Sequence, residues 1–328
     1  MTPTDELRHL KSIVEDSLGA TLKWGDDPEF VPDKLPTGIS QVDQALNGGF
    51  SFRRITLLIG AESAGKTLLA MTAIKAAQER NLPVVFLDVE RSWTAEWART
   101  VGIDPGRVLV SEPPDGESAF DVGRAIVKTE PAGVLVLDSL AAMPPAKELE
   151  AKLEDQQIGA QARMINRGLR DLNAENVGGW CVLIVNQLRE KVGITYGSPE
   201  TLPGGKGQRY YAWQIVRVRK GAAIEEGTGK DKRVVGRVLR VKLDKNKQGP
   251  PEAEAEVPFY YSGEFDVVSG LLDQAVELGI IEARGGYYTF GEERWHGRRA
   301  LREAFDDDER MARLRTALDD RTVDEADF

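Results

Sequence analysis

The segment at residues 60–67, GAESAGKT, matches the pattern G-x-x-x-x-G-K-[ST] of a phosphate-binding loop. The apolar run ITLLI precedes it, and the helix-forming run TLLAMTAIKAAQER follows it. Glycines in such a loop let the backbone curl, so that successive N–H groups and the N-terminus of the next helix face a phosphate. The sequence therefore predicts a strand, a phosphate loop and a helix in that order.

Short apolar runs on both sides of this segment indicate an α/β fold. The runs VVFLDV, VLVLD and CVLIVNQ lack polar alternation and are separated by helical segments. Strands buried on both faces have this composition in mostly parallel sheets flanked by helices. Farther along, WQIVRVRKG and VGRVLRVKLDKNK alternate polar and apolar residues, which is typical of half-buried antiparallel strands. The polar segment AAIEEGTGKDKRV is expected to connect them.

We expect three parts in the chain. Residues 1–33 form an N-terminal extension with an amphipathic helix, which must pack on another surface. Its apolar face consists of Leu7, Leu10, Ile13, Val14 and Leu18. Residues 34–262 form the α/β core, and residues 263–328 form a small α+β domain that ends in an acidic tail.

The formal net charge of −10 is unevenly distributed along the chain. Residues 263–328 contain 17 acidic and 9 basic residues, a net of −8, whereas residues 203–247 contain 13 basic and 4 acidic residues, a net of +9. Both segments are compatible with solvated faces. The basic segment also keeps nucleic-acid binding open despite the negative total.

Other features exclude several classes of protein. The single cysteine, Cys181, lies within an apolar run, and the two histidines, His9 and His296, are far apart. A disulfide framework is therefore excluded, and a zinc site is not expected. No apolar run is long enough to span a bilayer, and the charged N-terminus lacks a signal-peptide core. We expect a cytoplasmic protein without a membrane partner.

The phosphate loop implies ATP and Mg²⁺ as cofactors. Lys66 is expected to reach the β- and γ-phosphates, and Thr67 and Asp138 are the expected Mg²⁺ ligands. Ser139 is expected to hold the carboxylate of Asp138 in place. The expected nucleotide contacts in and next to the loop are Gly60, Ala61, Glu62, Ser63, Ala64, Gly65, Lys66, Thr67 and Leu68.

Hydrolysis requires a group that orients or deprotonates the attacking water. Glu90 ends the run VVFLDVE, on the strand expected to lie next to the phosphate loop. We take it as the candidate base, and Asp88 is the alternative in the same run.

Seven motifs occur in the order GAESAGKT, FLDVE, VLVLDSLAA, IGAQARM, NQLREKVG, GSPETLPGG and KLDKNK. Across about residues 35–261, this order and spacing resemble the bacterial RecA recombinases. The resemblance implies a RecA-like P-loop NTPase core with Glu90 as the base and Gln187 as the sensor of the γ-phosphate. It also implies that Lys245 and Lys247 reach the ATP of a neighbouring subunit.

The resemblance further places Trp97 and Tyr261 against the adenine. Two departures leave the base selectivity open, because Ala61 stands where the family usually has proline and Thr94 where it has aspartate. These departures suggest a divergent member of the family, such as a phage-encoded one.

Two segments are expected to bind DNA, one at about residues 147–160 with the helix after it, and one at residues 188–207. In the helix, Arg163, Asn166 and Arg170 have the spacing of one face. In the second segment, glycines let the backbone approach a strand, and Val192 matches the family's apolar wedge between bases. The full set is Ile158, Arg163, Asn166, Arg170, Arg189, Lys191, Val192, Thr201, Gly204, Gly205, Lys206 and Arg209.

The resemblance implies a DNA-dependent ATPase that forms helical filaments on single-stranded DNA. Such a protein catalyses homologous pairing and strand exchange with duplex DNA in recombination, repair and the SOS response to DNA damage. Two alternatives stay open: a hexameric, helicase-like motor on the same core, and an ATP-switched filament protein without strand exchange.

Overall fold

The computed structural model describes residues 3–27, 30–150, 159–190, 200–205, 207–227 and 231–326. The predictions for Ile158, Lys191, Val192 and Lys206 lie outside these residues. The chain divides into two compact units, Met1–Asp33 and Lys34–Phe328.

The first unit contains one helix, α1 (Pro3–Leu18), followed by a turn-rich segment. Lys11 forms an ion pair with Glu15 one turn later, at 2.6 Å, and Glu15 also accepts a hydrogen bond from the backbone N–H of Leu22 at 3.0 Å. Leu7 and Leu10 on the predicted apolar face are 53% and 54% exposed. The helix therefore presents this face to solvent in the single chain.

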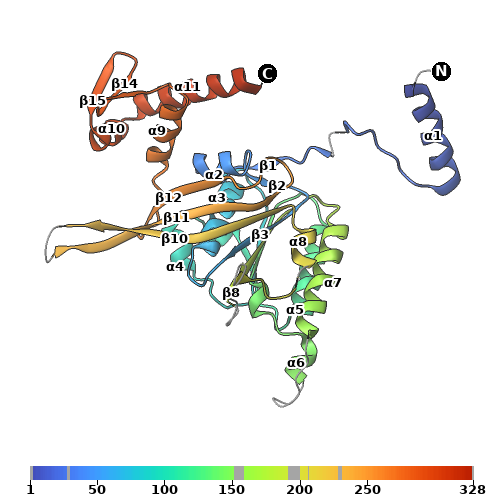
Figure 1. Ribbon diagram of the computed structural model, residues 1–328. Helices are drawn as coiled ribbons and strands as arrows, with labels where there is room; N and C mark the ends of the chain where they lie inside the picture. The colour runs from blue at the N-terminus through green and yellow to red at the C-terminus, as the bar shows by residue number, and fades with distance from the viewer. Residues whose placement is uncertain are drawn as a thin grey trace. The chain divides into compact units, whose positions relative to one another are not determined.

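The second unit is built on an eight-stranded sheet in the order β12-β11-β10-β3-β7-β6-β4-β5 (Figure 1). Parallel pairing joins β3 (Ile55–Gly60), β4 (Val84–Asp88), β5 (Leu109–Ser111), β6 (Val134–Asp138), β7 (Cys181–Gln187) and β10 (Gln214–Glu226). Antiparallel pairing adds β11 (Arg233–Asn246) and β12 (Glu254–Tyr260). The mostly parallel sheet confirms the predicted fold class.

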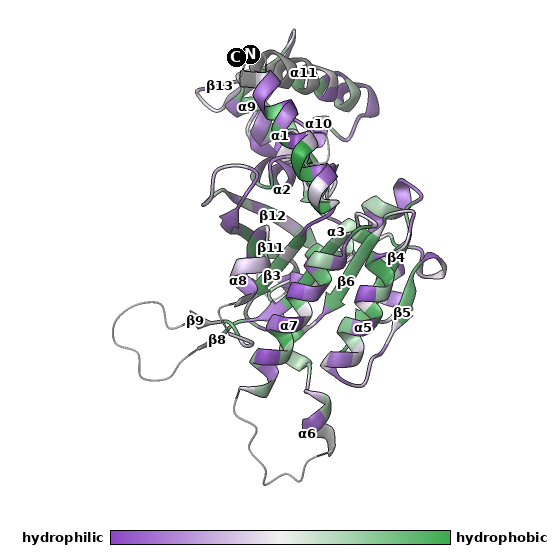
Figure 2. Ribbon diagram, turned by 90° about the vertical axis from the view of Figure 1, so that its right-hand side faces the viewer, coloured by the Kyte–Doolittle hydropathy of each residue, from purple (hydrophilic) through white to green (hydrophobic). Residues whose placement is uncertain are grey.

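Helices cover both faces of this sheet (Figure 1). Apolar side chains of α3 (Lys66–Glu79) pack with one set of strand residues, and those of α5 (Gly116–Val127) and α7 (Ala160–Glu175) pack with the alternate set. Strands β4 and β6 are fully buried and hydrophobic along most of their length (Figure 2). Burial on both faces is the physical reason for their uninterrupted apolar runs.

Several shorter elements lie around the eight-stranded sheet. The helices are α2 (Ser40–Ala45), α4 (Ala95–Thr100), α6 (Ala146–Glu150) and α8 (Gly207–Tyr211). Two small antiparallel pairs join β1 (Lys34–Leu35) with β2 (Phe50–Ser51) and β8 (Arg189–Glu190) with β9 (Glu200–Thr201).

The predicted polar connection between the two alternating strands is wrong in extent. Strand β10 continues to Glu226, and β11 begins at Arg233, so most of the segment AAIEEGTGKDKRV belongs to a long hairpin (Figure 1). Cross-strand ion pairs, Lys232 with Glu225 and Arg233 with Glu226, join its outer part. Opposite charges on paired strands stabilise a solvated hairpin that has few apolar residues.

The C-terminal region has an apolar cluster of its own. It contains α9 (Val267–Glu277), β13 (Glu282–Arg284), β14 (Tyr287–Phe290), β15 (Glu293–His296), α10 (Arg298–Ala304) and α11 (Asp308–Ala326). The three strands form a small antiparallel sheet, in agreement with the predicted α+β composition. None of the helices in the described ranges is long and apolar enough to cross a membrane.

Candidate functional site

The phosphate loop connects the end of β3 to the start of α3, as predicted. Gly60 cannot carry a side chain here, because a Cβ atom would lie 2.2 Å from the carbonyl oxygen of Val218. Gly65 precedes α3 with a φ of +99°, in the region that favours glycine. The Nζ of Lys66 donates a hydrogen bond to the carbonyl oxygen of Ala61 at 2.7 Å, and burial lowers the pKa of Lys66.

The remaining loop residues divide by exposure. Ala61, Glu62 and Ser63 are exposed at the tip of the loop, whereas Ala64 and Leu68 are buried beneath it. Any contact between a ligand and Leu68 would therefore involve its backbone.

Thr67 and Asp138 form a pair of oxygen ligands beside the loop. The hydroxyl of Thr67 donates to the Oδ2 of Asp138 at 2.5 Å. Asp138 is 2% exposed, and burial, assisted by the nearby charge of Glu90, raises its pKa to about 6. A hydroxyl and a carboxylate fit Mg²⁺, which binds proteins through one or two such groups and takes its other ligands from phosphates and water.

Glu90 lies just beyond the end of β4 and contacts the side chains of Ser139, which follows β6, and Gln187, the last residue of β7. Its Oε1 accepts hydrogen bonds from the hydroxyl of Ser139 and from the Nε2 of Gln187, the latter at 3.1 Å. The prediction that Ser139 holds Asp138 is wrong, because Thr67 takes that place. The preceding carboxylate, Asp88, is 1% exposed and accepts hydrogen bonds from the backbone N–H groups of the following turn.

Gln187 reaches this site because β7 lies next to β3. Gly60 and Gln187 are paired in the parallel register, and the N–H of Leu188 donates to the carbonyl oxygen of Gly60 at 2.9 Å. The structure therefore brings the phosphate loop, Glu90 and Gln187 together, although they are far apart in the sequence.

Trp97 and Tyr261, the residues expected to contact the adenine, are both partly exposed. Trp97, 36% exposed, packs edge-on against Phe259 with 6.2 Å between ring centroids. Tyr261, 50% exposed, follows Phe259 by two residues. Thr94, at the departure position, caps α4 by accepting a hydrogen bond from the N–H of Trp97 at 3.3 Å.

Lys245 and Lys247 are at the other end of the sheet. Lys245 lies in β11, and Lys247 directly follows the last residue of that strand. Strand β11 runs antiparallel to β10, and β10 runs parallel to β3. The two lysines therefore lie near the start of β3, which spans six residues or about 20 Å up to the phosphate loop. The Nζ of Lys245 donates to the carbonyl oxygens of Arg209 and Ala212, at 2.5 and 2.7 Å.

The residues predicted to bind DNA from α7 differ in their surroundings. Arg163 and Arg170 are exposed, and Arg170 pairs with Asp171 at 3.0 Å. Asn166 is half-buried, and a Cβ atom on Gly207 would lie 2.1 Å from its Oδ1. This amide therefore packs against the end of the second predicted DNA segment.

The described ends of that second segment are close together. Arg189 and Thr201 are paired between β8 and β9. Gly204 and Gly205 follow with φ values of +87° and +82°, and Arg209 is exposed on α8.

A buried amide pair anchors this segment, and the sequence analysis identified neither of its members. Asn186 and Gln208 are both fully buried, and the Nδ2 of Asn186 donates to the Oε1 of Gln208 at 2.7 Å. The Nε2 of Gln208 donates to the carbonyl oxygens of Pro203 and Gly205. A polar residue inside an apolar strand could have indicated Asn186, but Gln208 had no comparable signal.

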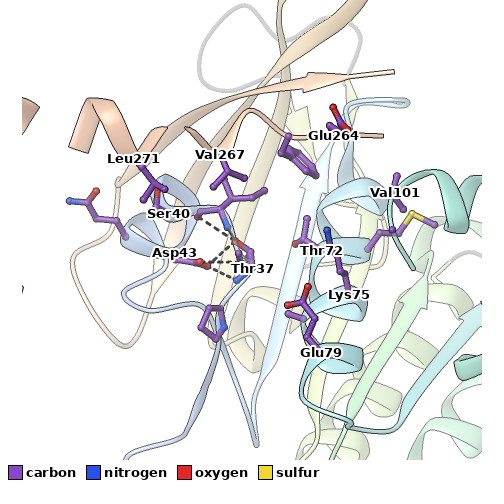
Figure 3. Close-up of a pocket in the computed structure, with 18 of the residues that line it drawn as sticks. Thr37, Ser40, Asp43, Thr72, Lys75, Glu79, Val101, Glu264, Val267 and Leu271 are labelled. Atoms are coloured by element: carbon purple, nitrogen blue, oxygen red, sulfur yellow. Dashed lines mark hydrogen bonds between the residues drawn. The ribbon is translucent and has the colours of Figure 1, made fainter. Parts of the chain in front are cut away.

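A cleft of about 1210 Å³ in the second unit is lined by Leu68 and later residues of α3 but by none of residues 60–67. It separates α2 and α3 from the C-terminal helices, and its lining includes Asp43, Lys75 and Leu271 (Figure 3). Asp43 is engaged by Thr37, whose N–H donates to it at 2.6 Å. The carboxylate of Asp43 therefore stabilises the local backbone at Thr37 and does not face the phosphate loop.

The family model of the RecA N-terminal domain matches residues 9–266. Protein RecA of Thermus aquaticus is 38% identical over 289 residues, which cover 87% of this chain and 84% of that protein. Protein RecA of Thermus thermophilus is 39% identical over 287 residues, covering 86% and 83%. Protein RecA of Chlorobaculum tepidum is 36% identical over 297 residues, covering 89% and 85%. The chain belongs to the RecA family.

Proposed function

We propose that this protein is an ATP- and Mg²⁺-dependent recombinase. It would form filaments on single-stranded DNA, hydrolyse ATP when bound to DNA, and catalyse homologous pairing and strand exchange with duplex DNA. The observation that carries this proposal is the contact between Gln187 and Glu90, because Gln187 ends the strand that leads into the second DNA segment. One side chain thereby joins the hydrolytic site to that segment.

Hydrolysis follows from the residues around the phosphate loop. Lys66 and the loop N–H groups would bind the phosphates, and Thr67 and Asp138 would hold a Mg²⁺ ion, which when bound would neutralise charge on the phosphates. Glu90 orients a water and accepts its proton as the oxygen attacks the γ-phosphorus. The bond to the bridging oxygen breaks, and ADP and phosphate leave. Asp88 is not available for this role because the turn after β4 occupies its oxygens.

Assembly would complete the site. Lys245 and Lys247 lie at the end of the sheet opposite the phosphate loop of their own chain, so they could meet only the nucleotide of another copy. A head-to-tail contact of this kind generates a filament when its rotation does not close and a ring when it does.

ATP would control DNA binding through Gln187. Alternate residues of a strand face opposite sides, so Gln187 faces Glu90 while Asn186 faces the amide network of the second segment. A nucleotide that repositions Gln187 would also shift Asn186 and the hydrogen bonds that hold the second segment. DNA bound to that segment would in turn favour the nucleotide-bound state.

Electron microscopy with a slowly hydrolysed ATP analogue tests the proposal. Helical filaments that require single-stranded DNA, together with joint-molecule formation in a pairing assay, are the expected result. Closed rings would favour the motor alternative. Filaments without joint molecules would favour the switch alternative.

A further inference from the structure

A charged side chain of β10, Lys220, lies at the end of the sheet that carries the phosphate loop. Strand β10 runs parallel to β3, with Arg217 opposite Ile59, so the residues after Val218 extend beyond the end of β3. The phosphate loop follows β3 at this same end. Lys220 is therefore level with the loop, on the side of β3 away from β7.

The alternation along β10 places Lys220 on the face of the sheet that α3 covers. Val216 and Val218 belong to the apolar cluster that contains Leu69 and Ile74 of α3. Side chains at every second position of a strand share a face, and the pairing of β10 with β11 is regular from Val216 to Lys220. Lys220 therefore continues the α3 face of β10 just past the buried core.

The residue opposite Lys220 contacts the phosphate loop. Lys220 is paired with Leu239 of β11, and paired side chains of antiparallel strands lie on one face with their Cβ atoms about 5 Å apart. Leu239 is buried, and a Cβ atom on Gly65 would lie 3.0 Å from its Cδ2. The base of the hairpin therefore packs against the loop directly before Lys66, and the side chain of Lys220 begins next to it.

The charge of Lys220 acts on the phosphate site. Its side chain is exposed and forms no ion pair within the part of the chain that the structure describes. Burial is the largest cause that lowers the pKa of Lys66, and the charge of Lys220 acts in the same direction. The carboxylates of Asp138, Glu90 and Glu62 act in the opposite direction. An anion bound between the two ammonium groups would offset their repulsion.

We propose that Lys220 binds phosphate oxygens of the nucleotide held by its own chain, from the side of the loop opposite the hydrolytic residues. This inference rests on the proposed function, because it requires a nucleotide at the loop. Glu90 and Gln187 lie at the ends of β4 and β7, whereas β10 lies on the other side of β3. Lys220 is therefore not placed to orient the attacking water, and it would contact oxygens that ATP and ADP share.

The position of Lys220 favours a nucleotide over a DNA backbone. Apolar side chains of α7, the helix that carries Arg163 and Arg170, pack on the opposite face of the sheet from α3. Lys220 shares the face of α3, whose N-terminus the phosphate loop joins. An ammonium group binds phosphate as a point charge, so one lysine beside the loop can add to the charge that Lys66 supplies.

Equilibrium binding of a fluorescent ADP analogue to the full-length chain, without DNA, tests the proposal. Lys220→Gln removes the charge, whereas Lys220→Arg keeps it. We expect Kd to rise about tenfold for Lys220→Gln, the loss of one charge-assisted hydrogen bond, and Lys220→Arg to retain most of the affinity. Both variants should unfold at the temperature of the unaltered protein, because Lys220 is exposed.

The matched control is Lys232→Gln, which removes one lysine from the same hairpin. Lys232 is 53% exposed and pairs with Glu225 in the outer part of the hairpin. It is seven positions from Leu239 in the sequence, or about 20 Å along a strand. Its substitution should leave the affinity for the ADP analogue unchanged.

Steady-state hydrolysis in the presence of DNA gives a second measurement. A group that binds ATP equally in the ground state and the transition state affects KM and not kcat. Lys220→Gln should therefore raise KM about tenfold at unchanged kcat, whereas loss of a group that acts on the attacking water lowers kcat.

The outcomes separate the two proposals. If the unaltered protein binds no nucleotide, both the proposed function and this inference fall. If it binds nucleotide but Lys220→Gln binds the ADP analogue as tightly as Lys232→Gln does, this inference alone is overturned. Equal losses for Lys220→Gln and Lys220→Arg would exclude the charge as the cause. Weaker DNA binding with normal nucleotide affinity would assign Lys220 to the DNA backbone and also overturn the inference.

Discussion

At the scale of single residues, the two carboxylates at the end of β4, Asp88 and Glu90, have different roles because they have different hydrogen-bond partners. Asp88 and Glu90 are two positions apart, yet Asp88 is buried and accepts hydrogen bonds from Ser92 and Trp93. Glu90 accepts hydrogen bonds from Ser139, which follows β6, and from Gln187 at the end of β7. We therefore assign a structural role to Asp88 and propose the catalytic role for Glu90.

Substitution of each carboxylate separates these roles. Glu90→Gln should lower ATP turnover by about a hundredfold or more while nucleotide binding and the thermal unfolding temperature stay unchanged. Asp88→Asn should lower the free energy of unfolding by about 2 kcal/mol, since an amide cannot accept all the same hydrogen bonds. Steady-state hydrolysis and urea unfolding measure the two effects. Normal turnover by Glu90→Gln would remove it as the base.

At the scale of elements, an ion-pair cluster fixes α7 against α5. Glu175, near the end of α7, binds Arg124 of α5 at 2.6 Å and Lys128 at 2.7 Å. The hydrogen bonds from Arg124 and then Lys128 lower the pKa of Glu175 from 4.5 to about 2. This cluster holds the helix that carries Arg163 and Arg170.

The stability provided by Glu175 should depend on pH. Because its pKa in the folded protein lies below the unfolded value of 4.5, the ionised carboxylate stabilises the fold above that pH. This contribution is lost as the pH falls from about 4.5 toward about 2. Glu175→Gln should therefore unfold at lower urea concentration near neutral pH, and the difference should shrink in acid.

The matched control is Glu303→Gln, which removes an exposed partner of Arg299. It should change the urea midpoint little at either pH, because exposed pairs contribute little to stability. A pH-independent effect of Glu175→Gln would contradict the electrostatic explanation.

The amide pair between β7 and α8 makes a second prediction at this scale. Gln208→Leu keeps the volume of the buried site but removes its hydrogen bonds to Asn186, Pro203 and Gly205. We expect normal nucleotide affinity, while the gain in single-stranded DNA affinity caused by ATP falls about tenfold. Fluorescence anisotropy with and without nucleotide measures this gain.

An exposed amide on α7, Asn173, provides the control substitution Asn173→Leu. It should leave the ATP-dependent gain in affinity intact. If Gln208→Leu also leaves it intact, the amide pair does not link the nucleotide to the DNA segment.

At the scale of the whole molecule, charge is segregated along the chain. The basic segment at residues 203–247 includes β10 and β11, and the acidic excess lies in residues 263–328. The apolar cluster of the C-terminal region includes Leu314 and Leu318. Removal of residues 319–328 would therefore leave that cluster in place.

This truncation removes five acidic residues and one basic residue. If the acidic end competes with DNA for the basic segment, duplex DNA affinity at low salt should rise about tenfold, and the rise should disappear at high salt. Anisotropy over a salt series measures it. Replacing the five acids with their amides in the intact chain must reproduce the rise, and an unchanged affinity would count against the competition.

The sequence by itself determined the α/β class, the parallel strands and the phosphate loop. These features depend on local properties, namely uninterrupted apolar runs and the spacing of glycine, lysine and threonine around residues 60–67. Their positions at the ends of apolar runs identified Asp138 and Glu90 as candidate site residues, and the resemblance of the motifs identified Gln187.

Only the tertiary structure decided which of these side chains meet. Ser139 donates its hydroxyl to Glu90 rather than to the adjacent Asp138, and Gln208 donates to the backbone at the end of the second predicted DNA segment. Likewise, Arg54 and Trp213 are 159 residues apart in the sequence, yet the guanidinium lies 4.5 Å from the centroid of the indole ring. No sequence pattern indicated this contact. Periodicity reports which face of an element is buried, but contacts between elements depend on strand order and register, which no local pattern contains.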